Sequence, residues 1–182
     1  MLRTVQCFLP VVGDPAALRH AFVDLPGRWL PDARQIGPDR WLMTVHAGQL
    51  ARTVTARIGT PWRAEETHWR SLSWDPVAED SGSGTFERLL PTLDGELGLN
   101  LDAGRATLLL DARYDPPGGA VGTVLDSVAL HRVARGTLDR LLAGIAARLS
   151  AEALLTVPGP TAPERPHASA ANDYLPEAGE PG

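Results

Sequence analysis

The 182-residue chain has a single cysteine, no lysine and no apolar run long enough to span a membrane. The one cysteine, Cys7, excludes an intramolecular disulfide framework and a metal site made of several thiolates. The five histidines are scattered without metal-ligand spacing, so we expect no metal ion and no cofactor. Since a membrane helix needs about 18 or more consecutive apolar residues, we also expect no membrane span.

The first residues, MLRTVQCFLP, combine one arginine with a short apolar run that Pro10 interrupts, and no small-residue cleavage site follows. This segment is a poor signal peptide. Together with the single cysteine, it predicts a reducing, cytoplasmic location.

All 17 positive charges are arginine, and 22 acidic residues give a formal net charge of −5. A nucleic-acid-binding domain presents a clustered excess of positive charge to the phosphate backbone. No such excess exists in this chain, so we expect no nucleic-acid partner.

The order of predicted elements is typical of an α+β fold. Leu2–Val12 alternates as a strand, and Asp14 with Pro15 is a good start for a short helix over Ala16–Val23. A second short helix is expected around Trp29. Short strands with turns between them follow, which predicts an antiparallel meander; they are Arg40–His46, Leu50–Ile58, Thr67–Trp74, Phe86–Leu90, Leu97–Leu101 and Ala106–Tyr114. The Asp94-Gly95 pair is interpreted as a break before the fifth of these strands.

The last ordered element is predicted to be one long helix that begins near Val121. Its apolar residues recur at the three-and-four spacing of one helix face; they are Val121, Val124, Leu125, Val128, Leu138, Leu142, Ile145 and Leu149. We expect a curved antiparallel sheet to pack around this helix, with a single domain over residues 1–155. Residues 156–182, rich in proline, glycine and acidic side chains, are expected to be a disordered tail.

Four blocks of sequence resemble the START-like or SRPBCC superfamily, also called helix-grip or polyketide cyclase/dehydrase-like, and in particular its uncharacterised actinobacterial members. The blocks are HWRSLSWDP (68–76), FERLLPTLDGELGL (86–99), TLLLDARYDPPGG (107–119) and the helix at 122–149. The resemblance implies a curved antiparallel sheet around a long C-terminal helix and a largely apolar cavity. With the element order above, this predicts a helix-grip fold of about six to seven strands, with two short helices after the first strand. Members range from lipid carriers to aromatase/cyclases, so the fold alone leaves function open.

Tryptophans and helix side chains are the candidate lining of that cavity. We expect Trp41, Trp69 and Trp74 from the strands, with Val128, Leu138 and Leu142 from the helix. Indole rings suit a flat or hydrophobic ligand, and their N–H groups offer a polar handle. Ordinary core packing explains the tryptophans equally well.

His131, Arg135 and Asp139 repeat every four residues and form a row on the predicted helix. If the row faces the cavity, His131 is a candidate general acid or base, and Arg135 a candidate partner for an enolate or carboxylate. The alternative is a row near an open end of the groove, with the charged groups in water.

Three functions therefore follow as hypotheses. The first is binding of a small hydrophobic or aromatic molecule between sheet and helix without catalysis. The second is a cyclase or dehydratase that uses His131 and Arg135. The third is an interaction protein that uses the outer sheet surface or the tail. The sequence predicts no particular oligomeric state.

Overall fold

The computed structural model describes residues 3–47, 50–77, 92–114 and 124–156. In the last helix, side chains are described for Arg132 and from Ala134 onward. Three predicted features lie outside the described residues. They are the strand Phe86–Leu90, the DPPGG residues that follow Tyr114, and the tail from residue 157 onward.

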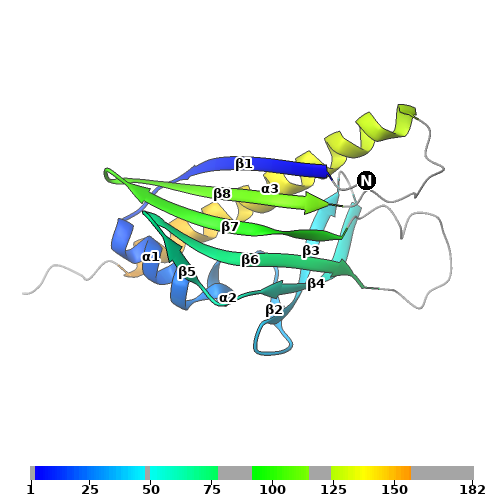
Figure 1. Ribbon diagram of the computed structural model, residues 1–182. Helices are drawn as coiled ribbons and strands as arrows, with labels where there is room; N and C mark the ends of the chain where they lie inside the picture. Colours follow the sequence, from blue (N-terminus) through cyan, green and yellow to red (C-terminus); the bar gives the residue numbers. More distant parts are fainter. Residues whose placement is uncertain (1–2, 48–49, 78–91, 115–123, 157–182) are drawn as a thin grey trace, which may run out of the picture.

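The described residues form an eight-stranded antiparallel sheet, two short helices and one long helix, which confirms the expected α+β class (Figure 1). The elements, in chain order, are β1 (Arg3–Val11), α1 (Pro15–Asp24), α2 (Pro26–Trp29), β2 (Arg34–Gln35), β3 (Arg40–Ala47), β4 (Leu50–Ile58), β5 (Trp62–Ala64), β6 (Thr67–Pro76), β7 (Leu93–Asp102), β8 (Arg105–Tyr114) and α3 (Val124–Thr156). The strand order is β1-β8-β7-β6-β4-β3-β2, and β5 pairs with β6.

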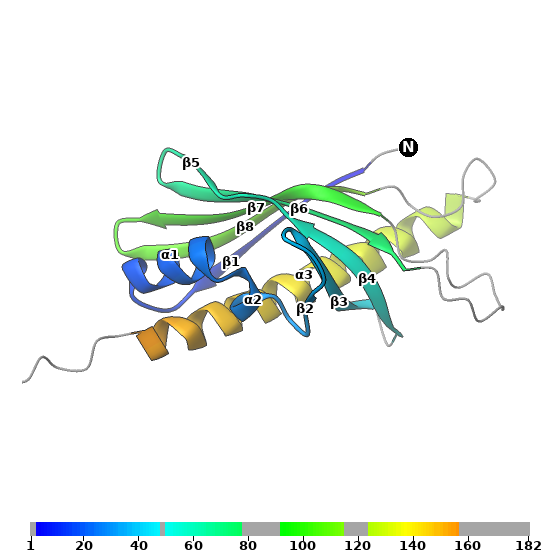
Figure 2. The same cartoon turned by 90° about the horizontal axis from the view of Figure 1, so that it is seen from below.

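Helix α3 lies across one face of the curved sheet, which we call the inner face (Figures 1 and 2). It packs against β1 at one edge and against β3 near the other, while α1 and α2 pack beside it. Its first turns extend beyond the ends of the strands (Figure 2). The helix therefore bridges the two sides of the sheet, as expected for a helix-grip fold.

Local signals set the start of α1 as predicted. Asp14 is the N-cap, and its Oδ1 accepts a hydrogen bond from the backbone N–H of Ala17 at 2.9 Å. Pro15 occupies the first turn, where its missing N–H costs nothing. Leu18 and Phe22, four residues apart, are fully buried, so the cap fixes which face of this helix enters the core.

Alternation along each strand separates the inner face from the outer face. On β8 every second residue from Ala106 to Tyr114 is buried, and the residues between them are partly or fully exposed. The same pattern, combined with the strand register, assigns the inner face of the other strands. On α3 the apolar stripe is buried as predicted at Leu138, Leu142, Ile145 and Leu149.

The prediction of a break at Asp94-Gly95 is wrong. Both residues belong to the continuous strand β7, where Asp94 pairs with Arg113 and Gly95 with Ala112. A Cβ atom at residue 95 would lie 2.5 Å from the carbonyl oxygen of Asp111. Glycine is therefore required here because β7 and β8 approach each other closely.

Arg70 on β6 ties α1 to the sheet from the inner side. Only 5% of the residue is exposed. Its Nε donates to the carbonyl oxygen of Phe22 at 3.1 Å, its Nη1 donates to that of Gly59 at 2.6 Å, and its Nη2 donates to that of Val23. Since Phe22 and Val23 lie in the last turn of α1, the guanidinium satisfies carbonyls that have no partner within the helix.

Among the helices of the described ranges, none combines the length and the apolar character needed to cross a membrane.

Candidate functional site

A row of buried side chains, four of them large, crosses the inner face of the sheet over five strands. Register pairs join Tyr114 to Leu93, Leu93 to Trp74, Trp74 to Ala56 and Ala56 to Trp41. All five residues are buried, with exposed fractions between 0% and 7%. We call this set the inner aromatic row. It presents three aromatic rings to the space between the sheet and α3.

In the next row toward α1 two positions are small, while the others are larger and buried; the row joins Val5, Ala112, Gly95, Leu72 and Ile58. Ala112 pairs with Gly95, and both follow the inner aromatic row by one inward-facing position on their strands. Neither residue carries a side chain beyond Cβ. A Cβ atom at residue 95 would lie 2.7 Å from the Ala112 Cα, so the two strands pack closely at these positions.

The helix side of the interior is apolar where its side chains are described. Leu138 and Leu142 are each 2% exposed and belong to the main core cluster. The side chains of Val128 and His131, which we also predicted at the site, lie outside the described part of α3. The structure thus brings Trp41, Trp74, Leu138 and Leu142 into one buried cluster.

Trp69, also predicted to line the cavity, lies on the outer face. It is one residue from the buried Arg70, and it pairs with Gly98. A Cβ atom at Gly98 would lie 2.7 Å from a carbon of the indole ring, so this ring covers the glycine. Trp69 therefore does not belong with the inner tryptophans, and we omit it from the proposed ligand contacts.

Arg135 and Asp139 form an exposed pair one turn apart on α3. The Arg135 Nε lies 3.7 Å from Asp139 Oδ2, and both side chains are 53% exposed. This position matches the alternative in which the charged row lies in water. Ala134, Thr137 and Leu138 in the same part of the helix are buried, so Arg135 lies at the exposed edge of a turn that the sheet covers.

Cys7 on β1 lies beside this pair, facing the helix. Burial raises the pKa of its thiol to about 11, and a hydrogen bond to Asp139 and the charge of that carboxylate contribute in the same direction. Arg135 opposes them. Because the thiolate is the reactive form, this cysteine is a poor nucleophile near neutral pH.

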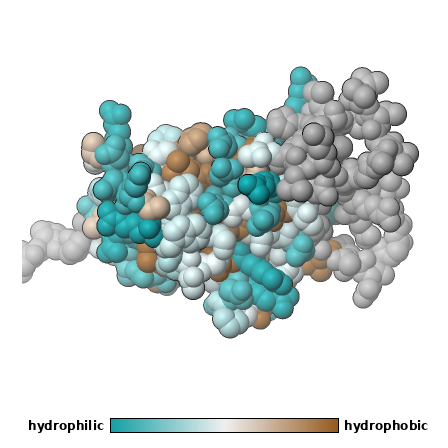
Figure 3. All heavy atoms as spheres, viewed as in Figure 1, coloured by the Kyte–Doolittle hydropathy of each residue, from teal (hydrophilic) through white to brown (hydrophobic). Residues whose placement is uncertain are grey.

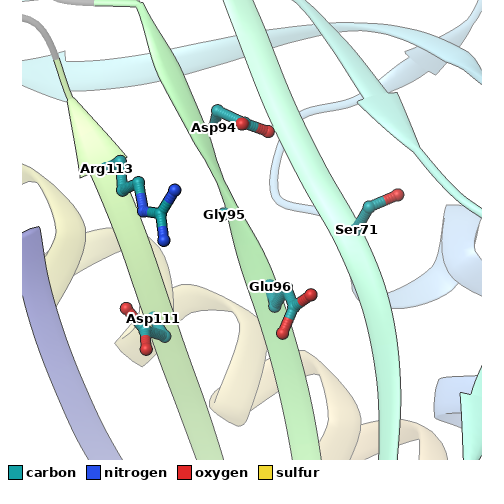
Figure 4. A pocket seen from close by; sticks show the side chains of 6 residues that line it. All are labelled: Ser71, Asp94, Gly95, Glu96, Asp111 and Arg113. Atoms are coloured by element: carbon teal, nitrogen blue, oxygen red, sulfur yellow. The ribbon is translucent and has the colours of Figure 1, made fainter.

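A pocket of about 290 Å³ lies on the outer face, away from α3 (Figure 4). It is lined by Ser71, Asp94, Gly95, Glu96, Asp111 and Arg113. Arg113 extends from β8 toward β7, where Asp94 and Glu96 project from the same face (Figure 4). The sequence analysis missed this cluster. Asp111 and Arg113 alternate visibly on their strand, but the misinterpreted turn at Asp94-Gly95 concealed the register that places Asp94 and Glu96 beside them.

Among the described side chains, no three His, Cys, Asp or Glu residues lie in an arrangement that could hold a metal ion.

Solved structures share this fold over most of the chain. The Zhui aromatase/cyclase from Streptomyces sp. R1128 superposes with a TM-score of 0.55 and 16% identity, covering 85% of this chain and 94% of that one. A START superfamily protein from Mycobacterium smegmatis gives 0.50 and 12%, covering 81% and 97%. The di-domain aromatase/cyclase BexL gives 0.54 and 14%, and the match covers 84% of this chain and half of BexL.

No protein-family model and no curated protein matches the sequence. The likeness to these structures therefore concerns the fold.

Proposed function

Since this chain has the helix-grip fold of the START-like superfamily, we propose that it binds a small hydrophobic or aromatic molecule between the inner face of the sheet and α3. We assign it no catalytic step. The proposal concerns the interior, where Trp41, Trp74, Leu138 and Leu142 belong to one buried cluster.

One observation carries the proposal: the three rings of the inner aromatic row and the apolar residues Leu138 and Leu142 of α3 lie in one buried cluster. Tyr114 and Trp74 supply flat apolar surface, and ligand sites are typically apolar with a few polar groups to orient the ligand. An apolar molecule that enters there removes its surface from water, which is worth roughly 25 cal/mol per Å² of apolar area.

The enzyme hypothesis receives less support. It requires His131 and Arg135 to converge on a bound substrate, and Arg135 is exposed and paired with Asp139. A solvated cation stabilises a developing enolate far less than a preorganised, buried one. We therefore favour binding over cyclase or dehydratase chemistry.

Two probes test the proposal directly: hexadecanoic acid, followed by native mass spectrometry, and the dye 1-anilinonaphthalene-8-sulfonate, followed by fluorescence. We expect one hexadecanoic acid per chain and displacement of the dye by it. The variant Ala112→Phe fills the interior and should weaken binding by about tenfold or more, which corresponds to about 1.4 kcal/mol.

The matched control is Leu109→Phe, three residues away on the outer face of the same strand, where binding should not change. If Ala112→Phe melts below the assay temperature, Leu142→Trp on α3 fills the same space from the other side. Unsaturable binding, or equal affinities for the inner and outer variants with the fold intact, would contradict the proposal.

A further inference from the structure

The outer face of the sheet carries a continuous apolar row. Register pairs join Phe8 to Leu109, Leu109 to Gly98, Gly98 to Trp69 and Trp69 to Trp62, so the row crosses β1, β8, β7, β6 and β5. We call these five residues the outer apolar row. It lies on the face opposite α3 and belongs to neither the core nor the inner aromatic row.

Much of this row is exposed to water. Phe8 is 63% exposed and Trp62 is 40% exposed. The Trp69 ring lies flat enough against the sheet to cover Gly98. The solvated face of an antiparallel sheet normally carries polar residues, and a line of exposed apolar residues usually marks an interaction surface. Aromatic side chains, tryptophan above all, are also the residues that contribute most to binding energy in protein interfaces.

An acidic row runs directly beside it. Asp111 lies two residues from Leu109 on β8, and Glu96 lies two residues from Gly98 on β7. Asp111 and Glu96 pair with each other, and Asp94 lies two residues beyond Glu96 on the same strand, in the same direction. Among the described side chains, these three carboxylates form no ion pair, and Asp111 accepts one hydrogen bond, from Gln6 Nε2 at 3.1 Å. With Arg113 as the one cation in the pocket lining, the cluster carries a charge of −2.

The space-filling view shows the two kinds of surface together. Hydrophobic residues, in brown, reach the surface in scattered places among hydrophilic residues, in teal (Figure 3). The pocket of about 290 Å³ lies within the acidic part. A partner can therefore bury apolar side chains on the outer apolar row while a longer side chain enters the pocket.

We propose that this outer face docks a segment of another protein that places apolar side chains on the outer apolar row and arginine or lysine over Asp94, Glu96 and Asp111. Charge complementarity supports this occupant, because the pocket lining holds three carboxylates and one arginine, and among the described side chains these carboxylates form no ion pair. A negatively charged membrane surface would be repelled by the same carboxylates.

A second copy of this chain fits the charges less well. If the outer apolar rows of two copies stack on each other, the acidic row of one copy has two possible neighbours in the second copy. One is the acidic row, and the other is the row that flanks the outer apolar row on its opposite side. That other row contains Pro10, Thr107, Asn100 and Thr67 and carries no charge. Neither arrangement supplies the missing positive charge.

Labelled peptides of simple repeating sequence test the proposal by fluorescence anisotropy with the full chain. The probe alternates leucine with arginine; one control replaces arginine by glutamate, and another replaces leucine by serine. We expect saturable binding of the leucine-arginine peptide alone, and an affinity that falls as salt increases. Equal binding of the glutamate peptide, or no binding of the leucine-arginine peptide at millimolar concentration, would overturn the proposal.

Variants locate the binding. The double variant Phe8→Ser with Trp62→Ser should weaken binding by about tenfold or more, and Glu96→Gln with Asp111→Asn should weaken it and reduce the salt dependence. Leu155→Ser, at a residue 79% exposed near the end of α3, is the control and should bind as wild type.

Two experiments test the other possible occupants. Sedimentation of the wild type tests a second copy of this chain, and capture on neutral lipid vesicles tests a membrane surface. A dimer, or vesicle binding, that disappears in the Phe8→Ser, Trp62→Ser variant would replace the peptide-like partner and overturn the proposal. The inner-face variant Ala112→Phe should leave peptide binding unchanged, so this result does not depend on the proposed ligand site.

Discussion

Arg70 offers the sharpest test of how the short helices are held to the sheet. Its guanidinium donates to the carbonyl oxygens of Phe22, Val23 and Gly59 while only 5% of the residue is exposed. Burial lowers the pKa of Arg70, and the charge of Asp24 opposes this effect. The variant Arg70→Met retains most of the apolar stem and removes all three donors.

The magnitude follows from the lost hydrogen bonds. A hydrogen bond to a charged group contributes about 1.5–3 kcal/mol, and a buried acceptor left without a partner costs about 1–3 kcal/mol. The cost of burying the guanidinium offsets part of this sum, and Phe22 retains a second donor in the Trp29 Nε1 at 3.3 Å. We expect Arg70→Met to lower the free energy of unfolding by about 3 kcal/mol.

Urea denaturation followed by tryptophan fluorescence measures this loss. For a chain of this size a loss of that order lowers the melting temperature by about 6–12 °C. Arg70→Lys keeps the charge but not the three-way geometry, and should fall between wild type and Arg70→Met. Arg63→Met, whose side chain is 59% exposed and bonded to Glu66, is the matched control. A loss below about 1 kcal/mol for Arg70→Met, or one no larger than that of Arg63→Met, would refute the reasoning.

Three further predictions concern single sites. Gly98→Ala should displace the Trp69 ring, whose nearest carbon is 2.7 Å from the new Cβ, cost about 1–3 kcal/mol and change the tryptophan emission. The Cys7 thiol should ionise near pH 11 by absorbance at 240 nm, and Asp139→Asn should lower this pKa; a midpoint unchanged by that variant would be contrary evidence. His68 should titrate below 6.5 by NMR, because burial and then Arg63 and Arg19 lower its pKa, and Glu66→Gln should lower it further.

The signs of the two pH effects differ. The pKa of Cys7 is higher in the folded chain, so its contribution to stability is complete below about pH 9 and is lost as the pH rises through about 11. The pKa of His68 is lower in the folded chain, so its contribution is present above 6.5 and is lost as the pH falls through the lowered value.

Local chemistry made several elements predictable from sequence. The Asp14-Pro15 pair set the start of α1 because capping involves only neighbouring residues. The apolar spacing of α3 gave its buried face at Leu138 and Leu142 for the same reason. Long-range geometry was not predictable in this way. Gly95 has the sequence context of a turn, but its role depends on a close approach to β8, a strand that follows it in the chain.

The same distinction between local pattern and long-range geometry applies to the candidate site. Alternation places neighbouring strand residues on opposite faces but does not show which face meets the helix. Trp69 was grouped with Trp74 although they are five positions apart along β6, an odd spacing that puts them on opposite faces. Arg135 has the angular position of a buried residue on α3, yet it is exposed. Ala134 and Thr137 beside it are buried, so Arg135 lies at the edge of the covered face, and a helical pattern does not show how wide that face is.

The most direct test of ligand binding in the interior is a methyl NMR titration of leucine-labelled protein with hexadecanoic acid. The account predicts that the methyl resonances of the buried Leu138 and Leu142 shift and saturate together, while those of the exposed Leu154 and Leu155 remain in place. Shifts confined to the exposed leucines or to Leu109, with Leu138 and Leu142 unmoved at saturation, would contradict it.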